Sequence, residues 1–189
     1  MAQVADMRGR LAPARERVAD IALVALAVGL AWALKAFYSR ATFADLAWVL
    51  TPTRRVVEWL TGAEFTPEAG EGFLSRDRLY LIAPACAGVN FMIVAFASLV
   101  CGLLHTRSTW RGRLALLAAS ALAAYATTVL ANAARIALAM QLHAARASWG
   151  PFTPERLHGI AGVTVYFVFL SLLFSAGARL TGARHELFA

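Results

Sequence analysis

Cysteine is scarce in this chain, and acidic side chains are outnumbered by basic ones. The two cysteines, Cys86 and Cys101, stand 15 residues apart in one apolar run. That separation is about 22 Å along a helix, so a disulfide between them is excluded. The sequence has no HExxH motif and no CxxC pair, so we expect no metal and no other cofactor. No internal repeat or long linker is visible, which favours a single domain.

Hydrophobic residues make up 60% of the 189 positions, and the mean hydropathy of +0.61 is too high for an ordinary soluble domain. The 18 basic against 11 acidic residues lie mostly in short segments between apolar runs. This pattern is typical of a membrane protein and not of a nucleic-acid partner. We expect an all-α integral membrane protein, a four-span helical bundle with a small extracytoplasmic segment of helices and a β-hairpin.

The distribution of charge divides the chain into five segments. They are a basic N-terminus (1–17), a first span (18–38), an extracytoplasmic segment (39–83), a three-span catalytic core (84–181) and a short tail (182–189). Uncharged runs such as Ala87–Leu104 and Gly159–Ala178 are long enough to cross a bilayer core of about 30 Å. Basic residues cluster at both termini and at 105–113, which predicts that these regions lie on the cytoplasmic side of the inner membrane.

The first apolar run, Ile21–Leu34, has two interpretations. It has the length of a signal-peptide core, which would be cleaved off. We favour a retained anchor, because Phe37 and Tyr38 follow it and aromatic residues suit a membrane interface. Lys35 would then extend its amine towards the headgroups. Both interpretations place residue 41 onward outside the cytoplasm.

Residues 39–83 carry too much charge to span a membrane. The spacing of apolar residues predicts two short amphipathic helices, the second with Thr51 as N-cap and Pro52 in its first position. These helices either lie on the outer membrane surface or pack on the bundle as ordinary helices. The turn-like residues Glu68–Gly72 separate two β-prone arms, 63–67 and 73–82, and predict a β-hairpin.

Three polar residues each stand one bilayer thickness from a basic residue of their own helix. The pairs are Cys86 with Arg107, Arg113 with Arg135, and His158 with Arg179, separated by 21 or 22 residues. At helical rise each separation is about 32 Å, which matches the membrane. The sequence therefore predicts that three helices bring a cysteine, an arginine and a histidine to the outer interface.

The three residue types suit nucleophilic catalysis. If Pro84 is the first helical residue, Cys86 lies in the first turn of the second span, where free backbone N–H groups favour a thiolate. His158, about one turn inside the fourth span, is the candidate base. Arg135 keeps its charge and is suited to stabilise an oxyanion. Each also has a structural alternative: a small packing cysteine, an interfacial arginine anchor and a capping histidine.

Three neighbouring residues are candidates for positioning a substrate. Gly88 has no side chain, so another backbone or a substrate can approach it closely. Asn90 is one turn below Cys86, and Asn132 shares a face with the predicted arginine. His143 is the rival of the histidine in the fourth span, but it lacks a capped helix start.

Three motifs follow one another along the chain: PACAG (84–88) with Asn90-Phe91, NAARI (132–136) and HGIAG (158–162). In this order they resemble the exosortase/archaeosortase family of membrane cysteine transpeptidases, especially the short exosortase K type. Two features depart from the family pattern. Many members carry Ser where this chain has Ala87, and many have about twice as many spans.

The resemblance implies a membrane-embedded cysteine protease/transpeptidase that cleaves C-terminal sorting signals of exported proteins at the outer face of the cytoplasmic membrane. Cys86 would carry the acyl group, Arg135 would stabilise the oxyanion and His158 would move protons. Its partners would be a membrane protein substrate and an envelope lipid or glycan acceptor, with water as the other acceptor. The sequence specifies neither the sorting motif nor an oligomeric state.

Two other classes of function stay open at this point. In a non-enzymatic scaffold for envelope assembly, the three polar residues would form a structural hydrogen-bonded cluster. A small carrier would use Arg135 as its anion site, but the sequence shows no inverted repeat and no broken helix, which argues against transport.

Overall fold

Four long helices dominate the structure, a computed structural model that describes the backbone of residues 2–145 and 154–181 and the side chains of residues 18, 21–145 and 159–181. The helices are α1 (Ala2–Tyr38), α3 (Val89–Leu103), α4 (Trp110–Ala144) and α5 (Pro154–Thr181). With their flanking turns they provide four stretches long and apolar enough to cross a membrane: Ile21–Tyr38, Pro84–Thr106, Trp110–Ala144 and Gly159–Thr181. The expected all-α integral membrane protein is confirmed.

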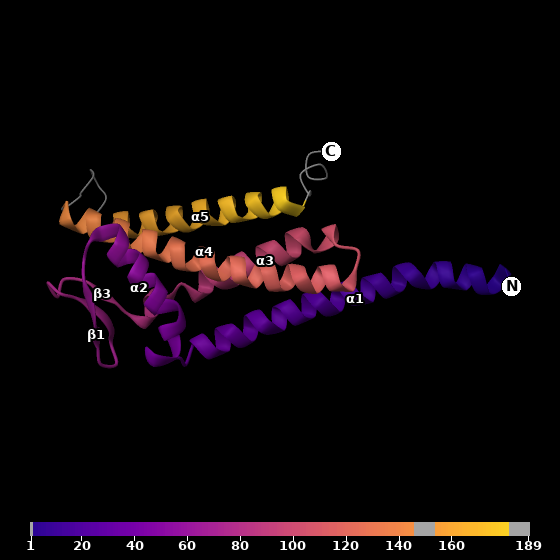
Figure 1. The fold of residues 1–189 in the computed structure, drawn as a ribbon, viewed down its shortest axis with the longest axis horizontal. Coiled ribbons are helices and arrows are strands. Elements are labelled where there is room, and N and C mark those ends of the chain that lie inside the picture. Colours follow the sequence, from indigo (N-terminus) through magenta and orange to yellow (C-terminus); the bar gives the residue numbers. More distant parts are fainter. Residues whose placement is uncertain (1, 146–153, 182–189) are drawn as a thin grey trace.

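The four helices run along the long axis of the molecule, and α2 and the strands gather at one end, which we call the sheet end (Figure 1). At this end α1 and α4 finish and α3 and α5 begin. The 3-10 turn η3 (Leu104–Thr106) connects α3 to α4 at the opposite end. Polar side chains from several helices can therefore come together at the sheet end.

Glycines bring α5 close to α3. A Cβ atom at Gly177 would lie 2.9 Å from Cδ1 of Leu103, and one at Gly102 would overlap the ring of Phe174. Membrane helices gain little from burying apolar groups, since lipid is apolar as well, so close packing of this kind holds them together. These contacts hold the C-terminal half of α5 against α3.

A three-stranded antiparallel sheet leads from α2 to α3. Its strands β1 (Phe65–Glu68), β2 (Gly72–Ser75) and β3 (Leu81–Ile82) lie in the order β1-β2-β3. The predicted hairpin is confirmed, with Phe65 opposite Ser75. The predicted second arm, 73–82, is not one strand, because it turns after Ser75 and returns as β3, where Leu81 pairs with Leu74.

Asp77 closes the turn between β2 and β3. Its carboxylate accepts hydrogen bonds from the Ser75 hydroxyl group at 2.6 Å and from the Leu79 N–H at 3.1 Å. These bonds, led by that of Ser75, hold the pKa of Asp77 below its usual value. Arg78 adopts a φ of 58° in this turn. Side-chain acceptors such as Asp77 favour turns over continued strands, which explains the break.

Helix α2 (Ala47–Thr61) does not begin at the predicted position. The prediction of Thr51 as N-cap and Pro52 as first residue is wrong: α2 follows the 3-10 turn η1 (Ala44–Leu46) directly and has Pro52 in its interior. The helical segment is capped further upstream. There the Thr42 N–H donates to the Asp45 carboxylate at 2.8 Å, and the Asp45 N–H donates to the Thr42 hydroxyl at 3.4 Å.

Packing of α2 on the bundle depends on that interior proline. Val49, Leu50 and Val57 are completely buried, so α2 is an ordinary helix packed on the bundle, the second of the two alternatives. Pro52 has no N–H, which leaves the carbonyl of Trp48 without its usual partner. The Tyr125 hydroxyl group from α4 donates to this carbonyl at 2.8 Å, and the rings of Trp48 and Tyr125 stack with centroids 5.6 Å apart.

Replacing Tyr125 by Phe should destabilise the protein because it keeps the stacked ring but leaves the Trp48 carbonyl unpaired. We expect the free energy of unfolding in detergent to fall by about 1 kcal/mol. In a Pro52→Ala background, which restores the missing N–H, the same change should cost clearly less. An equal loss in the free energy of unfolding in the two backgrounds would contradict the pairing of the Tyr125 hydroxyl group with the Trp48 carbonyl.

Candidate functional site

A short turn between β3 and α3 presents the Cys86 side chain. The turn is a 3-10 helix, η2 (Pro84–Ala87), with its proline in the first position after the extended residue Ala83. The Cys86 N–H donates to the Ala83 carbonyl at 2.8 Å, and the side chain is half-buried. Cys86 therefore lies in the first turn of the span Pro84–Thr106, as predicted. This turn is separate from α3, which begins at Val89, and the N–H of Cys86 is bonded and not free.

Gly88 makes the bend between η2 and α3. Its φ of 69° is left-handed, a conformation that a residue with a side chain adopts at a cost. A Cβ atom there would lie 3.1 Å from Cγ2 of Thr128 and 3.4 Å from Cγ of Asn132, both on α4. The close approach expected at Gly88 is thus made by α4, which reaches the backbone next to Cys86.

Asn132 connects three elements at this point. Its side chain is completely buried on α4, and its amide nitrogen donates a hydrogen bond to the backbone carbonyl of Cys86. Its amide oxygen accepts from the Tyr166 hydroxyl group on α5 at 3.0 Å. The same oxygen accepts from two guanidinium nitrogens of Arg135, each at 3.4 Å. One buried amide thus joins the cysteine turn, α4 and α5.

Arg135 is half-buried between α4 and α5. Its guanidinium carbon lies 5.6 Å from the ring centroid of Tyr166, a distance at which cation–π attraction acts. A Cβ atom at Gly162 would lie 3.3 Å from Cδ of Arg135, so this glycine makes room for the arginine stem. Among the side chains that the structure describes, no carboxylate pairs with Arg135. Its charge is therefore open to an anionic group of a ligand.

Tyr166 is the site residue that sequence reasoning missed. Its ring stacks on Phe91 of α3 with centroids 4.7 Å apart, while its hydroxyl group holds Asn132. The sequence feature that could have pointed to Tyr166 is a tyrosine inside an apolar span, because a phenol group at that depth requires a hydrogen-bond partner.

Asn90 is not part of this cluster. It was expected one turn below Cys86 on a continuous helix, but the bend at Gly88 interrupts that helix. The Asn90 side chain is exposed and accepts a hydrogen bond from the Lys35 amine of α1 at 2.7 Å. The expected snorkelling of Lys35 is thus replaced in the structure by a bond that ties α1 to α3.

The two candidate histidines lie on different elements. Residue 158 is in the second turn of α5, one helical turn before Gly162, which touches Arg135. The side chain of His158 lies outside the described residues, so its predicted role stays a prediction. His143, near the end of α4, packs edge-to-face on Tyr80, with ring centroids 5.7 Å apart.

The site gathers groups that suit nucleophilic chemistry. The backbone of a half-buried cysteine, a guanidinium without a described carboxylate partner and a phenol group meet around one amide. Among the residues that the structure describes, no group of three or more His, Cys, Asp or Glu side chains is placed to hold a metal ion. A carbonyl or carboxylate of a substrate is the kind of group that such a guanidinium binds.

Fold and site together define a multi-pass membrane protein with a polar cluster at one end of its helical bundle. Comparison with protein families goes further: the model of the transmembrane exosortase family matches residues 73–175, more than half of the chain. The chain therefore belongs to the transmembrane exosortase family. The match runs from β2 into α5 and includes the whole cluster around Asn132. No curated protein and no solved structure matches the chain.

Family membership supports a membrane transpeptidase role in general, with protein substrates that carry sorting signals. The resemblance noted in the sequence is confirmed at the level of the family.

Replacing Gly88 by Ala should destabilise the site, because alanine resists the left-handed φ and its Cβ atom crowds Thr128 and Asn132. We expect a loss of about 1–2 kcal/mol, seen as a lower midpoint of thermal unfolding in detergent. Gly29→Ala is the matched control, since a Cβ atom at that helical position of α1 meets nothing within 4 Å. Equal midpoints for the two variants would contradict a requirement for glycine at position 88.

Proposed function

We propose that this protein is a membrane cysteine protease/transpeptidase that cleaves C-terminal sorting signals of exported proteins through an acyl-enzyme on Cys86. The observation that supports this most is the Asn132 bridge, which links the backbone of the cysteine turn to the arginine predicted to act with it. Family membership supports the same general chemistry. A purely structural cluster would not need a guanidinium without a described carboxylate partner on the same amide that holds the backbone of a half-buried cysteine.

In the proposed first step, the Cys86 sulfur attacks the carbonyl carbon of the scissile peptide bond and its proton passes to His158. The carbonyl oxygen gains negative charge, which the Arg135 guanidinium stabilises. The C–N bond then breaks, and His158 returns the proton to the departing amine. The products of this step are a thioester on Cys86 and the released signal segment.

In the second step, an amine or hydroxyl group of an acceptor attacks the thioester carbon. The C–S bond breaks, the acceptor loses its proton through His158, and the Cys86 thiol is regenerated. An envelope lipid or glycan is the proposed acceptor, and water in its place gives hydrolysis. The same arginine stabilises the oxyanion in both steps.

Asn132 and Tyr166 act as positioning residues in this proposal. Asn132 holds the Cys86 carbonyl and the Arg135 guanidinium at the same time. Tyr166, packed on Phe91, fixes the orientation of that amide from the opposite side. Positioning of this kind supplies a large share of catalytic power, because the reacting groups need not be ordered during the reaction.

The proposed orientation places the sheet end outside the cytoplasmic membrane. Arg107, Arg111 and Arg113 lie at the connection between α3 and α4, at the opposite end of the bundle. Basic residues in short loops stay on the cytoplasmic side. Exported substrates would then meet Cys86 at the outer membrane interface.

Cys86→Ala should abolish processing of a co-expressed membrane substrate that carries a C-terminal sorting signal, because no other group near the turn can form the thioester. Processing is measured as the loss of the signal segment by immunoblot and intact mass, with the enzyme level in the membrane measured in parallel. Cys101→Ala is the matched control, since this exposed cysteine lies 15 residues away on α3. Full processing by a stably inserted Cys86→Ala variant would contradict the proposal and favour the scaffold alternative.

His158→Gln and His143→Gln should separate the two candidate bases. We expect His158→Gln to slow processing by about 10²–10⁴-fold, the range for a general acid–base group. His143→Gln should leave the rate close to that of the unmodified protein, since the His143 ring is used in packing on Tyr80. The reverse ranking in the same processing assay would assign the base to His143 and overturn the role given to His158.

A further inference from the structure

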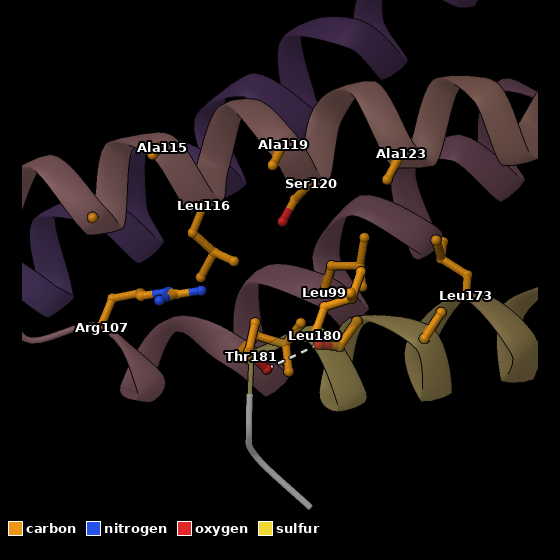
Figure 2. A pocket seen from close by; sticks show the side chains of 14 residues that line it. Leu99, Arg107, Ala115, Leu116, Ala119, Ser120, Ala123, Leu173, Leu180 and Thr181 are labelled. Atoms are coloured by element: carbon orange, nitrogen blue, oxygen red, sulfur yellow. Dashed lines mark hydrogen bonds between the residues drawn. The ribbon is translucent and has the colours of Figure 1, made fainter.

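A cavity of about 510 Å³ lies between α3, α4 and α5 (Figure 2). No residue of the cysteine turn lines it. Its walls are mainly apolar. Small side chains on α4, those of Ala115, Ala119 and Ala123, line one side, and Leu173 and Leu180 of α5 line the other. The cavity belongs to the half of the bundle where α3 turns into α4, so it is separate from the site around Asn132.

The cavity has the depth of one membrane leaflet. Along α4 its lining runs from Gly112 to Ala123, a distance of about 16 Å at helical rise. That is about half of the 30 Å thickness of the hydrocarbon core. The lining along α5, from Leu173 to Thr181, covers a similar depth. The cavity therefore extends from the membrane interface to the region of the bilayer midplane.

The cavity is long and narrow, with a volume of about 510 Å³ over a length of about 16 Å. A single extended alkyl chain is the apolar group that suits so narrow and long a space.

The interface end of the cavity carries a positive charge. The side chain of Arg107 extends along the cavity towards Leu116 (Figure 2), and it is exposed. Among the side chains that the structure describes, no carboxylate forms an ion pair with it. An apolar slot one leaflet deep with a guanidinium at its mouth complements a lipid that has a negative headgroup.

We propose that this cavity binds one anionic phospholipid, with an acyl chain between α4 and α5 and the headgroup phosphate on the Arg107 guanidinium. Arginine suits this role because its planar donors match phosphate oxygens. The proposal does not depend on the activity proposed for Cys86. The bound lipid would fill a gap that the four helices leave open in the half of the bundle distant from the sheet.

Native mass spectrometry of the full chain can test this, after reconstitution into nanodiscs with equal amounts of phosphatidylglycerol and phosphatidylcholine. The unmodified protein should retain one phosphatidylglycerol in preference to phosphatidylcholine. Arg107→Gln should weaken retention of phosphatidylglycerol about fivefold, the effect of one basic residue near the membrane surface. Ala119→Phe should remove the bound lipid by filling the slot.

Two matched controls accompany these variants. Arg179→Gln removes a charge from α5 outside the cavity lining, and Ala118→Phe places the same ring on the neighbouring exposed position of α4. Both should retain phosphatidylglycerol like the unmodified protein. Equal retention of the two lipids, or retention unchanged by both Arg107→Gln and Ala119→Phe, would overturn the proposal. So would a dimer that Ala119→Phe converts to monomers, since a second copy would then be the occupant.

Discussion

The side-chain amide of Asn132 is completely buried in a membrane-spanning helix, and its donor and acceptor groups must both be satisfied within the protein. The partners come from three elements: the Cys86 carbonyl on η2, Arg135 on α4 itself, and the Tyr166 hydroxyl group on α5. Leaving one of these groups unpaired would cost about 1–3 kcal/mol. A single amide therefore sets the register between the cysteine turn and two spanning helices, and the geometry of the site depends on it.

The same requirement explains the rest of the sheet end. Pro52 takes one donor away from α2, and Tyr125 of α4 supplies the replacement at the Trp48 carbonyl. Gly88 has no side chain, so α4 can approach the backbone beside Cys86. At Trp48, α4 pairs a helix carbonyl that has lost its donor, and at Gly88 it covers backbone that is not helical. Irregular backbone at membrane depth is tolerated only where protein covers it, and α4 provides that cover.

The architecture could be predicted from the sequence because run length and charge determine which segments cross a membrane. The four spans and the hairpin follow from patterns within about 20 neighbouring residues, and so do Cys86 and Arg135 as candidates. The errors have a common cause, which is that a partner distant in sequence decides the local structure. Tyr125 pairs the carbonyl that Pro52 leaves without a donor inside α2, and Asn90 bonds Lys35 instead of lying beside the cysteine. Tyr166 belongs to the site because its hydroxyl group bonds Asn132, and the spacing of residues along the chain does not predict this contact.

The environment of Arg135 is suited to a temporary negative charge. A buried carboxylate would neutralise the guanidinium, but it would also cancel the field that the arginine exerts on a substrate oxygen. Among the described side chains the arginine instead has two weaker partners, the Asn132 amide oxygen and the face of the Tyr166 ring. Cation–π attraction contributes only about 0.5–2 kcal/mol, so the cation is held in place without being paired. An oxyanion forming beside Cys86 would then be its strongest partner, and stabilisation would rise with the charge that develops on that oxygen.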